Sequence, residues 1–195
     1  MANKLLDLLT KLATGKLVVV FILLVYVVNA FVLKAIYPSY IYPGFETLDF
    51  QSSYSPERAY QLIDSYGEEG RQYYALIELT LDLIYPILNA LMFSTLTIYL
   101  FRRIFPPDSF WQKLPLLGPI VMIVDYLENA GIVTMLLSYP RRLDVVAQAA
   151  NVFTVAKFSL SYLEMILIVI GLLGWLGKTA YIRFRSSNGE ISHEQ

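Results

Sequence analysis

The sequence contains no cysteine and a single histidine, His193, which lies near its end. Thiol–disulfide chemistry is therefore excluded, including that of four-helix quinone-linked redox enzymes. Bis-histidine haem sites, HExxH zinc sites and Ser-His-Asp triads all need histidines that the chain does not have. Walker loops, GxGxxG, a nucleophile elbow and internal repeats are also missing. No cofactor is expected, and no motif supports an enzyme, although general acid–base catalysis by Asp or Glu stays open.

Charge of either sign is scarce as well. The chain has 15 Lys and Arg against 16 Asp and Glu, a net charge of −1, so nucleic-acid binding has no electrostatic support. In contrast, 56% of the residues are hydrophobic and the mean hydropathy is +0.53. This composition is typical of a small polytopic membrane protein, whose main partner is the lipid bilayer. The oligomeric state is not indicated.

Four apolar stretches are each long enough to cross a bilayer, which takes about 20 helical residues. The first follows three lysines like a signal peptide, but its apolar run is longer, so we expect an uncleaved transmembrane helix. The sequence thus predicts an all-α bundle of four transmembrane helices in one domain, residues 1–185. The spans are expected at 17–37, 73–101, 114–137 and 147–176, with an outer loop at 38–72 and a disordered cytoplasmic tail at 186–195.

Two short interfacial helices are predicted outside these spans. Leucines at positions 5, 6, 9 and 12 share one helical face, as in an amphipathic helix lying on a membrane. In the outer loop, Ser55 and Pro56 form a typical helix start, and Gly67 can end that helix. We expect the loop helix to cover the bundle, either as an ordered connector or as a gate.

The distribution of Lys and Arg predicts the orientation in the membrane. Nine lie on one side of the predicted spans and four on the other, so the positive-inside rule places both termini in the cytoplasm, in a bacterial plasma membrane. The nine are Lys4, Lys11, Lys16, Arg102, Arg103, Lys113, Lys178, Arg183 and Arg185; the four are Arg58, Arg71, Arg141 and Arg142.

Ionisable and polar side chains recur at helical spacing inside three of the spans. Each charge at the centre of a bilayer costs at least ~2.5–3.5 kcal/mol, so these stripes should face inward. At ~1.5 Å per residue, Asp82, Glu128, Asn129 and Lys157 fall roughly 12–15 Å below the outer surface, with Asp125 a little deeper and Glu164 nearer the inner side. Pro86 should kink the second span and free the Asp82 carbonyl. The predicted site residues are Glu78, Asp82, Tyr85, Asp125, Glu128, Asn129, Lys157, Ser161 and Glu164.

The charges in this layer limit its function. Four of the acids face one lysine, so some carboxyl groups are protonated or a cation is present, and Arg71 could add a positive charge at the mouth. A polar acidic cavity could bind or transport a small amphiphile or cation. It could equally form a proton or cation pathway, with Mg²⁺ or Ca²⁺ preferred over zinc. Alternatively, this is a structural or assembly protein whose buried polar layer specifies helix packing.

Two resemblances rest on these residues. The segments Gly67-Glu68-Glu69-Gly70-Arg71, Asp82-Leu83-Ile84-Tyr85-Pro86 and Asp125-Tyr126-Leu127-Glu128-Asn129 resemble small four-helix bacterial membrane proteins with no assigned function. Glu78-Leu79, Asp82-Leu83 and Pro86 are also similar to the acidic second helix of the EXPERA domain, and Asn29 lies where that family often has an acid. The second resemblance implies an intramembrane pocket for lipophilic amines or sterols, or an isomerase-type protein. Unlike that family, the chain has no histidine in a span and has an Asp/Glu pair in the third.

Overall fold

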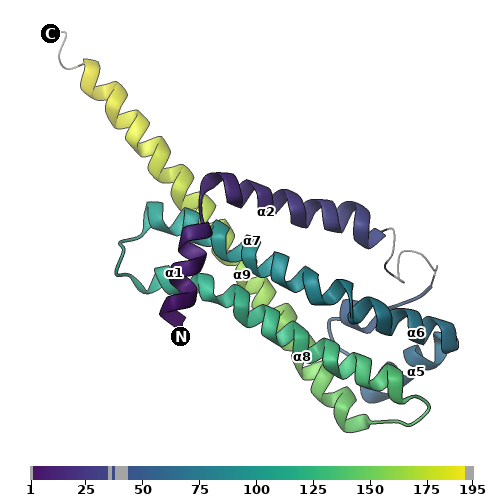
Figure 1. Cartoon of the computed structure of the whole chain (residues 1–195). Coiled ribbons are helices and arrows are strands. Elements are labelled where there is room, and N and C mark those ends of the chain that lie inside the picture. The colour runs from purple at the N-terminus through teal and green to yellow at the C-terminus, as the bar shows by residue number, and fades with distance from the viewer. Residues whose placement is uncertain (1, 35–36, 38–43, 192–195) are drawn as a thin grey trace.

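A computed structural model describes residues 2–34, 37 and 44–191, with side chains as far as residue 185 (Figure 1). Helices make up the folded elements of these residues, and no strand occurs among them, which confirms the predicted all-α class. In chain order the elements are α1 (Ala2–Leu12), α2 (Gly15–Val27), the π-helical η1 (Val28–Leu33), the 3₁₀ turn η2 (Leu48–Phe50), α5 (Pro56–Ser65), α6 (Gly67–Glu78), α7 (Leu81–Ile104), the 3₁₀ segment η3 (Phe110–Leu116), α8 (Leu117–Ser138) and α9 (Asp144–Ile191).

Four helical segments are long and apolar enough to cross a membrane, as predicted. They run over Gly15–Leu33, Gly67–Ile104, Phe110–Ser138 and Asp144–Arg185. Residues 35–36, at the predicted end of the first span, lie outside the described residues. Many large apolar side chains on α2 and α9 are exposed, among them Val19, Leu23, Leu163 and Leu173. Such faces are stable in lipid rather than water, so the fold is that of an integral membrane protein.

Glycines set the register of the bundle by allowing close helix contacts. Gly118 of α8 faces Ser94 of α7, and Gly131 of α8 faces Ala150 of α9. Further along α9, Gly171 packs on Leu100 and Gly174 packs on Ile104, both of α7. Helices α7 and α9 therefore run in parallel, with α8 antiparallel to both.

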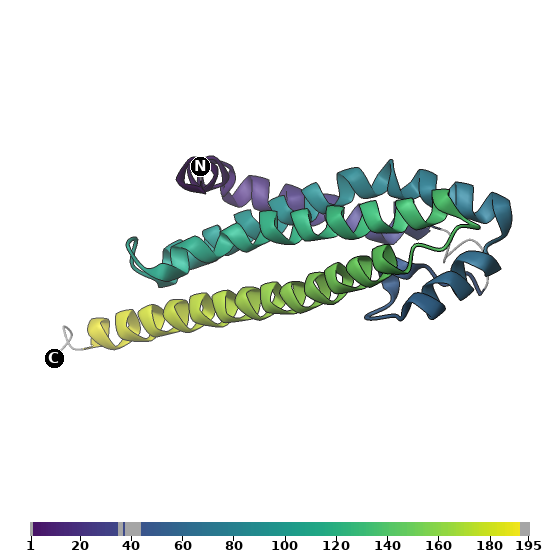
Figure 2. The same ribbon diagram turned by 90° about the horizontal axis from the view of Figure 1, so that it is seen from below.

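The two ends of the bundle differ. Helix α1 packs on α7 and η3 with Leu9 buried, and the far half of α9 projects beyond the bundle at that same end (Figure 1). At the opposite end lie η2, α5 and the start of α6, which we call the loop end. Figure 2 shows α9 running from the loop end along the whole bundle. Its backbone stays helical to Ile191, through the first residues of the predicted tail.

The loop helix forms as its sequence predicts. The Ser55 side chain accepts a hydrogen bond from the Arg58 amide at 3.2 Å, and Pro56 is the first residue of α5. Gly67 adopts a φ of +65° and separates α5 from α6, so the second span begins earlier than residue 73. Asn151 of α9 fixes the preceding loop, because its Oδ1 accepts from the Tyr54 amide at 2.7 Å and from Ser53 Oγ at 3.1 Å.

The second span is interrupted between α6 and α7, at Leu79 and Thr80. Thr80 departs from helical geometry (φ −124°, ψ −71°), and its hydroxyl donates to the Leu76 carbonyl at 2.6 Å. The interruption thus precedes Pro86, where the kink was predicted, and α7 runs through the proline. The interruption lies between Glu78 and Asp82, so it changes the orientation of these two acids relative to each other.

Candidate functional site

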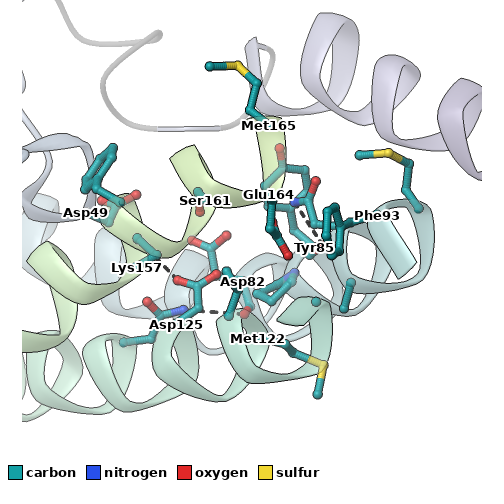
Figure 3. A pocket seen from close by; sticks show the side chains of 18 of the residues that line it. Asp49, Asp82, Tyr85, Phe93, Met122, Asp125, Lys157, Ser161, Glu164 and Met165 are labelled. Carbon is teal, nitrogen blue, oxygen red and sulfur yellow. Dashed lines mark hydrogen bonds and ion pairs between the residues drawn. The ribbon is translucent and has the colours of Figure 1, made fainter. Parts of the chain in front are cut away.

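A cavity of about 450 Å³ lies among η1, η2, α7, α8 and α9 (Figure 3). Seven of the nine predicted site residues line it, namely Asp82, Tyr85, Asp125, Asn129, Lys157, Ser161 and Glu164. Glu78 and Glu128 do not line it. They are fully buried next to it, at 1% and 0% exposure. The helical stripes read from the sequence therefore converge, and the acids around the cavity fall into three groups.

The first group is an ion-pair network between α8 and α9. Lys157 Nζ lies 3.2 Å from Asp125 Oδ1 and also pairs with the Glu128 carboxylate. Thr154 Oγ1 donates to the other Glu128 oxygen at 2.6 Å. One ammonium thus serves two carboxylates inside an apolar span, where a buried charge is stable only with such partners.

The second group, which we call the carboxyl triad, consists of Asp49, Glu78 and Asp82. One oxygen from each lies within 4.8 Å of the other two. Glu78 is the last residue of α6 and Asp82 is the second residue of α7, so the break between the helices brings both to Asp49, which the η2 turn supplies from the loop end. Asp49 and Asp82 also line the cavity.

Tyrosine hydroxyls hold Asp49 in place. Tyr74 donates to Asp49 Oδ1 at 2.5 Å, and Tyr37 donates to Oδ2. Burial, reinforced by the Asp49 charge, raises the pKa of Tyr37 well above its ordinary value, so it stays a neutral donor. Asp49 is therefore a fixed part of the site, although it comes from a loop.

The side-chain amide of Asn129 lies between the triad acids. In one orientation it donates to the Asp82 carbonyl at 3.5 Å, a weak contact. In the other it donates to Glu78 Oε2 at 3.3 Å and to the Asp125 carbonyl at 3.2 Å. The second orientation makes two better contacts, so we assign Asn129 as a donor to Glu78.

Glu164 alone forms the third group. Gly171 of α9 contacts Leu100 of α7, and this contact fixes the register of the two parallel helices. Glu164 and Phe93 each lie seven residues before these contact residues, so Glu164 is level with Phe93. Figure 3 shows Glu164, Tyr85 and Phe93 on one side of the cavity and Asp49 on the other. Glu164 Oε1 is inaccessible to solvent and has no hydrogen-bond partner among the described residues.

The first span reaches the site through Tyr85. The Tyr85 hydroxyl donates to Asn29 Oδ1 at 3.0 Å, while Asn29 Nδ2 donates to the Val25 carbonyl at 2.8 Å. Asn29 lies in η1, and π-helical turns within helices are frequent at functional sites. Leu33, at the end of η1, lines the cavity.

Two features were not predicted from the sequence. Asp49 had no signal beyond its place in an acidic loop, and the apolar cavity wall of Leu33, Phe93, Met122 and Met165 is composed of residues that any core contains. Arg71, in turn, does not supply charge to the cavity. It donates to the Ile63 carbonyl at 3.3 Å and lies 4.1 Å from the ring centre of Tyr139.

Comparison with known proteins gives no relative. No family model matches the chain, and neither a curated protein nor a solved structure matches it. The resemblances to bacterial membrane proteins and to the EXPERA domain therefore stay predictions. The function has to be argued from the geometry of the cavity.

Proposed function

We propose that the cavity binds a small amphiphile with a cationic head group. Its volume falls within the range of roughly 300–1,000 Å³ that is usual for small-molecule sites, and its wall combines apolar side chains with few polar ones. Six carboxyl groups line it or lie directly behind its wall, whereas Lys157 is the one lysine or arginine among the described residues of its lining and already pairs with two of them. A positively charged ligand would balance this excess.

The observation that carries the proposal is the Glu164 carboxyl group beside Phe93, because its buried Oε1 has no hydrogen-bond partner among the described residues. A carboxylate binds an ammonium by a charge-assisted hydrogen bond, and an aromatic face adds a cation–π attraction. The apolar tail of the ligand would contact Met122, Met165 and Leu33 on the cavity wall.

Helix packing alone explains less of the site. The bonds of Lys157 with Asp125 and Glu128 join α8 to α9, as a structural role requires. Glu164 Oε1, by contrast, bonds to no other helix within the described chain. A buried carboxyl oxygen without a partner is costly, so the position of Glu164 Oε1 favours a ligand that pairs with it.

The proposal includes the orientation in the bilayer. The bundle separates α1, the end of α7, η3 and the far half of α9, which carry the nine Lys and Arg, from the loop end, which carries the four and Lys34 just beyond the first span. The positive-inside rule then supports cytoplasmic termini and a loop end outside the cell. Because the chain has no cysteine, single cysteines at the exposed positions Ser52 and Asp108 can test this by labelling with an impermeant maleimide from outside. Labelling at residue 52 alone is expected.

The ligand proposal is tested with octylamine and its uncharged match octanol, on purified protein in nanodiscs, by isothermal titration calorimetry. Octylamine is expected to bind the parent protein more tightly than octanol. Glu164→Gln should weaken octylamine roughly 10- to 100-fold, since a hydrogen bond to a charged group contributes about 1.5–3 kcal/mol. The control Glu46→Gln changes an exposed acid paired with Arg58 and should have no effect. Equal binding of the two probes, or unchanged octylamine binding in Glu164→Gln, would refute the proposal.

A further inference from the structure

We propose that Asp49, Glu78 and Asp82 form a site for one divalent cation of the size of Ca²⁺. This site lies at the loop end of the cavity and is separate from the head-group position at Glu164. The three residues come from η2, α6 and α7, so a bound cation would tie the loop to the break in the second span.

The spacing of the triad fits calcium. Oxygen ligands lie 2.3–2.6 Å from Ca²⁺, so two ligands of one ion can be as much as about 5 Å apart. The triad oxygens all lie within 4.8 Å of one another, which is inside this limit. Mg²⁺ holds its ligands at 2.0–2.1 Å, which limits them to about 4 Å, so Ca²⁺ tolerates the wider range of separations.

An unsatisfied atom in the triad points independently to a ligand. Glu78 is 1% exposed, and its Oε2 accepts from Asn129, but its Oε1 has no hydrogen-bond partner among the described residues. A buried carboxyl oxygen is ordinarily paired, because leaving it unpaired costs the full desolvation of the atom. A cation between Glu78 and its two neighbouring acids would satisfy it.

The surroundings of Asp49 resemble the outer shell of a metal site. Ligating carboxylates are commonly hydrogen-bonded by a second layer of residues, which fixes their orientation. The Tyr37 and Tyr74 hydroxyls donate to different oxygens of Asp49, a pairing that the ionised carboxylate accepts. Each oxygen keeps a further lone pair for a cation.

A cation would balance the charge of the triad without protonation of its acids. Lys157 does not do so by contact, because the contacts of its ammonium are to Asp125 and Glu128. Three carboxylates with one divalent ion carry a net charge of −1, which a span tolerates better than −3. The cavity beside Asp49 and Asp82 provides an entry path and room for waters to complete the six to eight ligands.

The test uses the full chain in phosphatidylcholine nanodiscs with Ca²⁺ and Tb³⁺ as probes. Tb³⁺ resembles Ca²⁺, and Tyr37 and Tyr74 lie close enough to sensitise its luminescence. Tb³⁺ emission that Ca²⁺ displaces more effectively than Mg²⁺, together with a melting temperature raised by Ca²⁺, is the expected result. Glu78→Gln, which keeps the shape of the side chain, should weaken Ca²⁺ at least tenfold.

Three further variants complete the test. Asp82→Asn should also weaken Ca²⁺ at least tenfold, and it keeps the inference testable if Glu78→Gln does not fold. Glu46→Gln and Glu164→Gln should bind Ca²⁺ like the parent. Absence of a Ca²⁺ effect on the parent, or Ca²⁺ binding that survives in both triad variants, would overturn the inference. Neither result touches the amine proposal, because that depends on octylamine binding through Glu164.

Discussion

The ammonium of Lys157 on α9 lies 3.2 Å from the carboxylate of Asp125 on α8, although both residues lie inside apolar spans. The same ammonium pairs with Glu128, which is fully buried. A buried ion pair of this kind contributes little against a well-packed apolar alternative, but removing one partner leaves an uncompensated charge. The network therefore makes the contact between α8 and α9 depend on Lys157.

Replacement of Lys157 by Met should lower the free energy of unfolding by about 3–5 kcal/mol, because two buried carboxylates lose their common partner. Unfolding in a dodecyl sulfate titration, followed by circular dichroism, measures the loss. The exposed Lys113 at the other end of the bundle provides the control Lys113→Met, which should change stability by less than about 0.5 kcal/mol. An equal effect of both substitutions would show that Lys157 does not stabilise the helix contact.

The sequence sufficed to predict the four spans and the approach of Asp82, Asp125, Glu128 and Lys157 across three helices, because helical periodicity determines which residues share a face. It did not reveal Asp49, since a loop has no periodicity and the η2 turn is held by tertiary bonds to Tyr37 and Tyr74. The break at Thr80 was also missed. The prediction concentrated on Pro86, whereas the chain leaves the helical path before it.

Gly118 should not tolerate a methyl group. A Cβ at this position would lie 2.6 Å from Ser94 Oγ and 2.9 Å from the Ala90 carbonyl oxygen, and the backbone atom cannot move away alone. We expect Gly118→Ala to cost about 1–3 kcal/mol by forcing α7 and α8 apart. The matched control is Gly177→Ala on the exposed part of α9, where a Cβ meets nothing within 4 Å. Alanine should stabilise that helix by about 0.5–1 kcal/mol. Melting temperatures that rise in both variants would contradict this packing.

Tyr54 should make the protein sensitive to alkali. Burial raises its pKa to about 12 in the folded protein, whereas the unfolded chain ionises it near pH 10. The contribution of Tyr54 to the free energy of unfolding is therefore intact below pH 10. It is lost between pH 10 and 12, which lowers the free energy of unfolding by as much as about 2–3 kcal/mol. Tyr54→Phe should flatten this part of the dependence of melting temperature on pH, and Tyr181→Phe, at an exposed position, should not. Parallel curves for Tyr54→Phe and the parent would contradict the assignment.

Asn151 should control how firmly the loop holds Asp49 at the cavity. Its Oδ1 accepts hydrogen bonds from both the Tyr54 amide and the Ser53 hydroxyl, so it links α9 to the backbone of the residues that follow η2. Asn151→Ala leaves the backbone amide of Tyr54 without this acceptor, at a cost of about 1–3 kcal/mol. Amide hydrogen exchange in residues 48–56 should accelerate accordingly, while exchange in α7 should not. Asn151→Asp keeps an acceptor in the same place and is expected to retain most of the protection. If exchange in the loop is the same in Asn151→Ala as in the parent, Asp49 is positioned by its tyrosines alone.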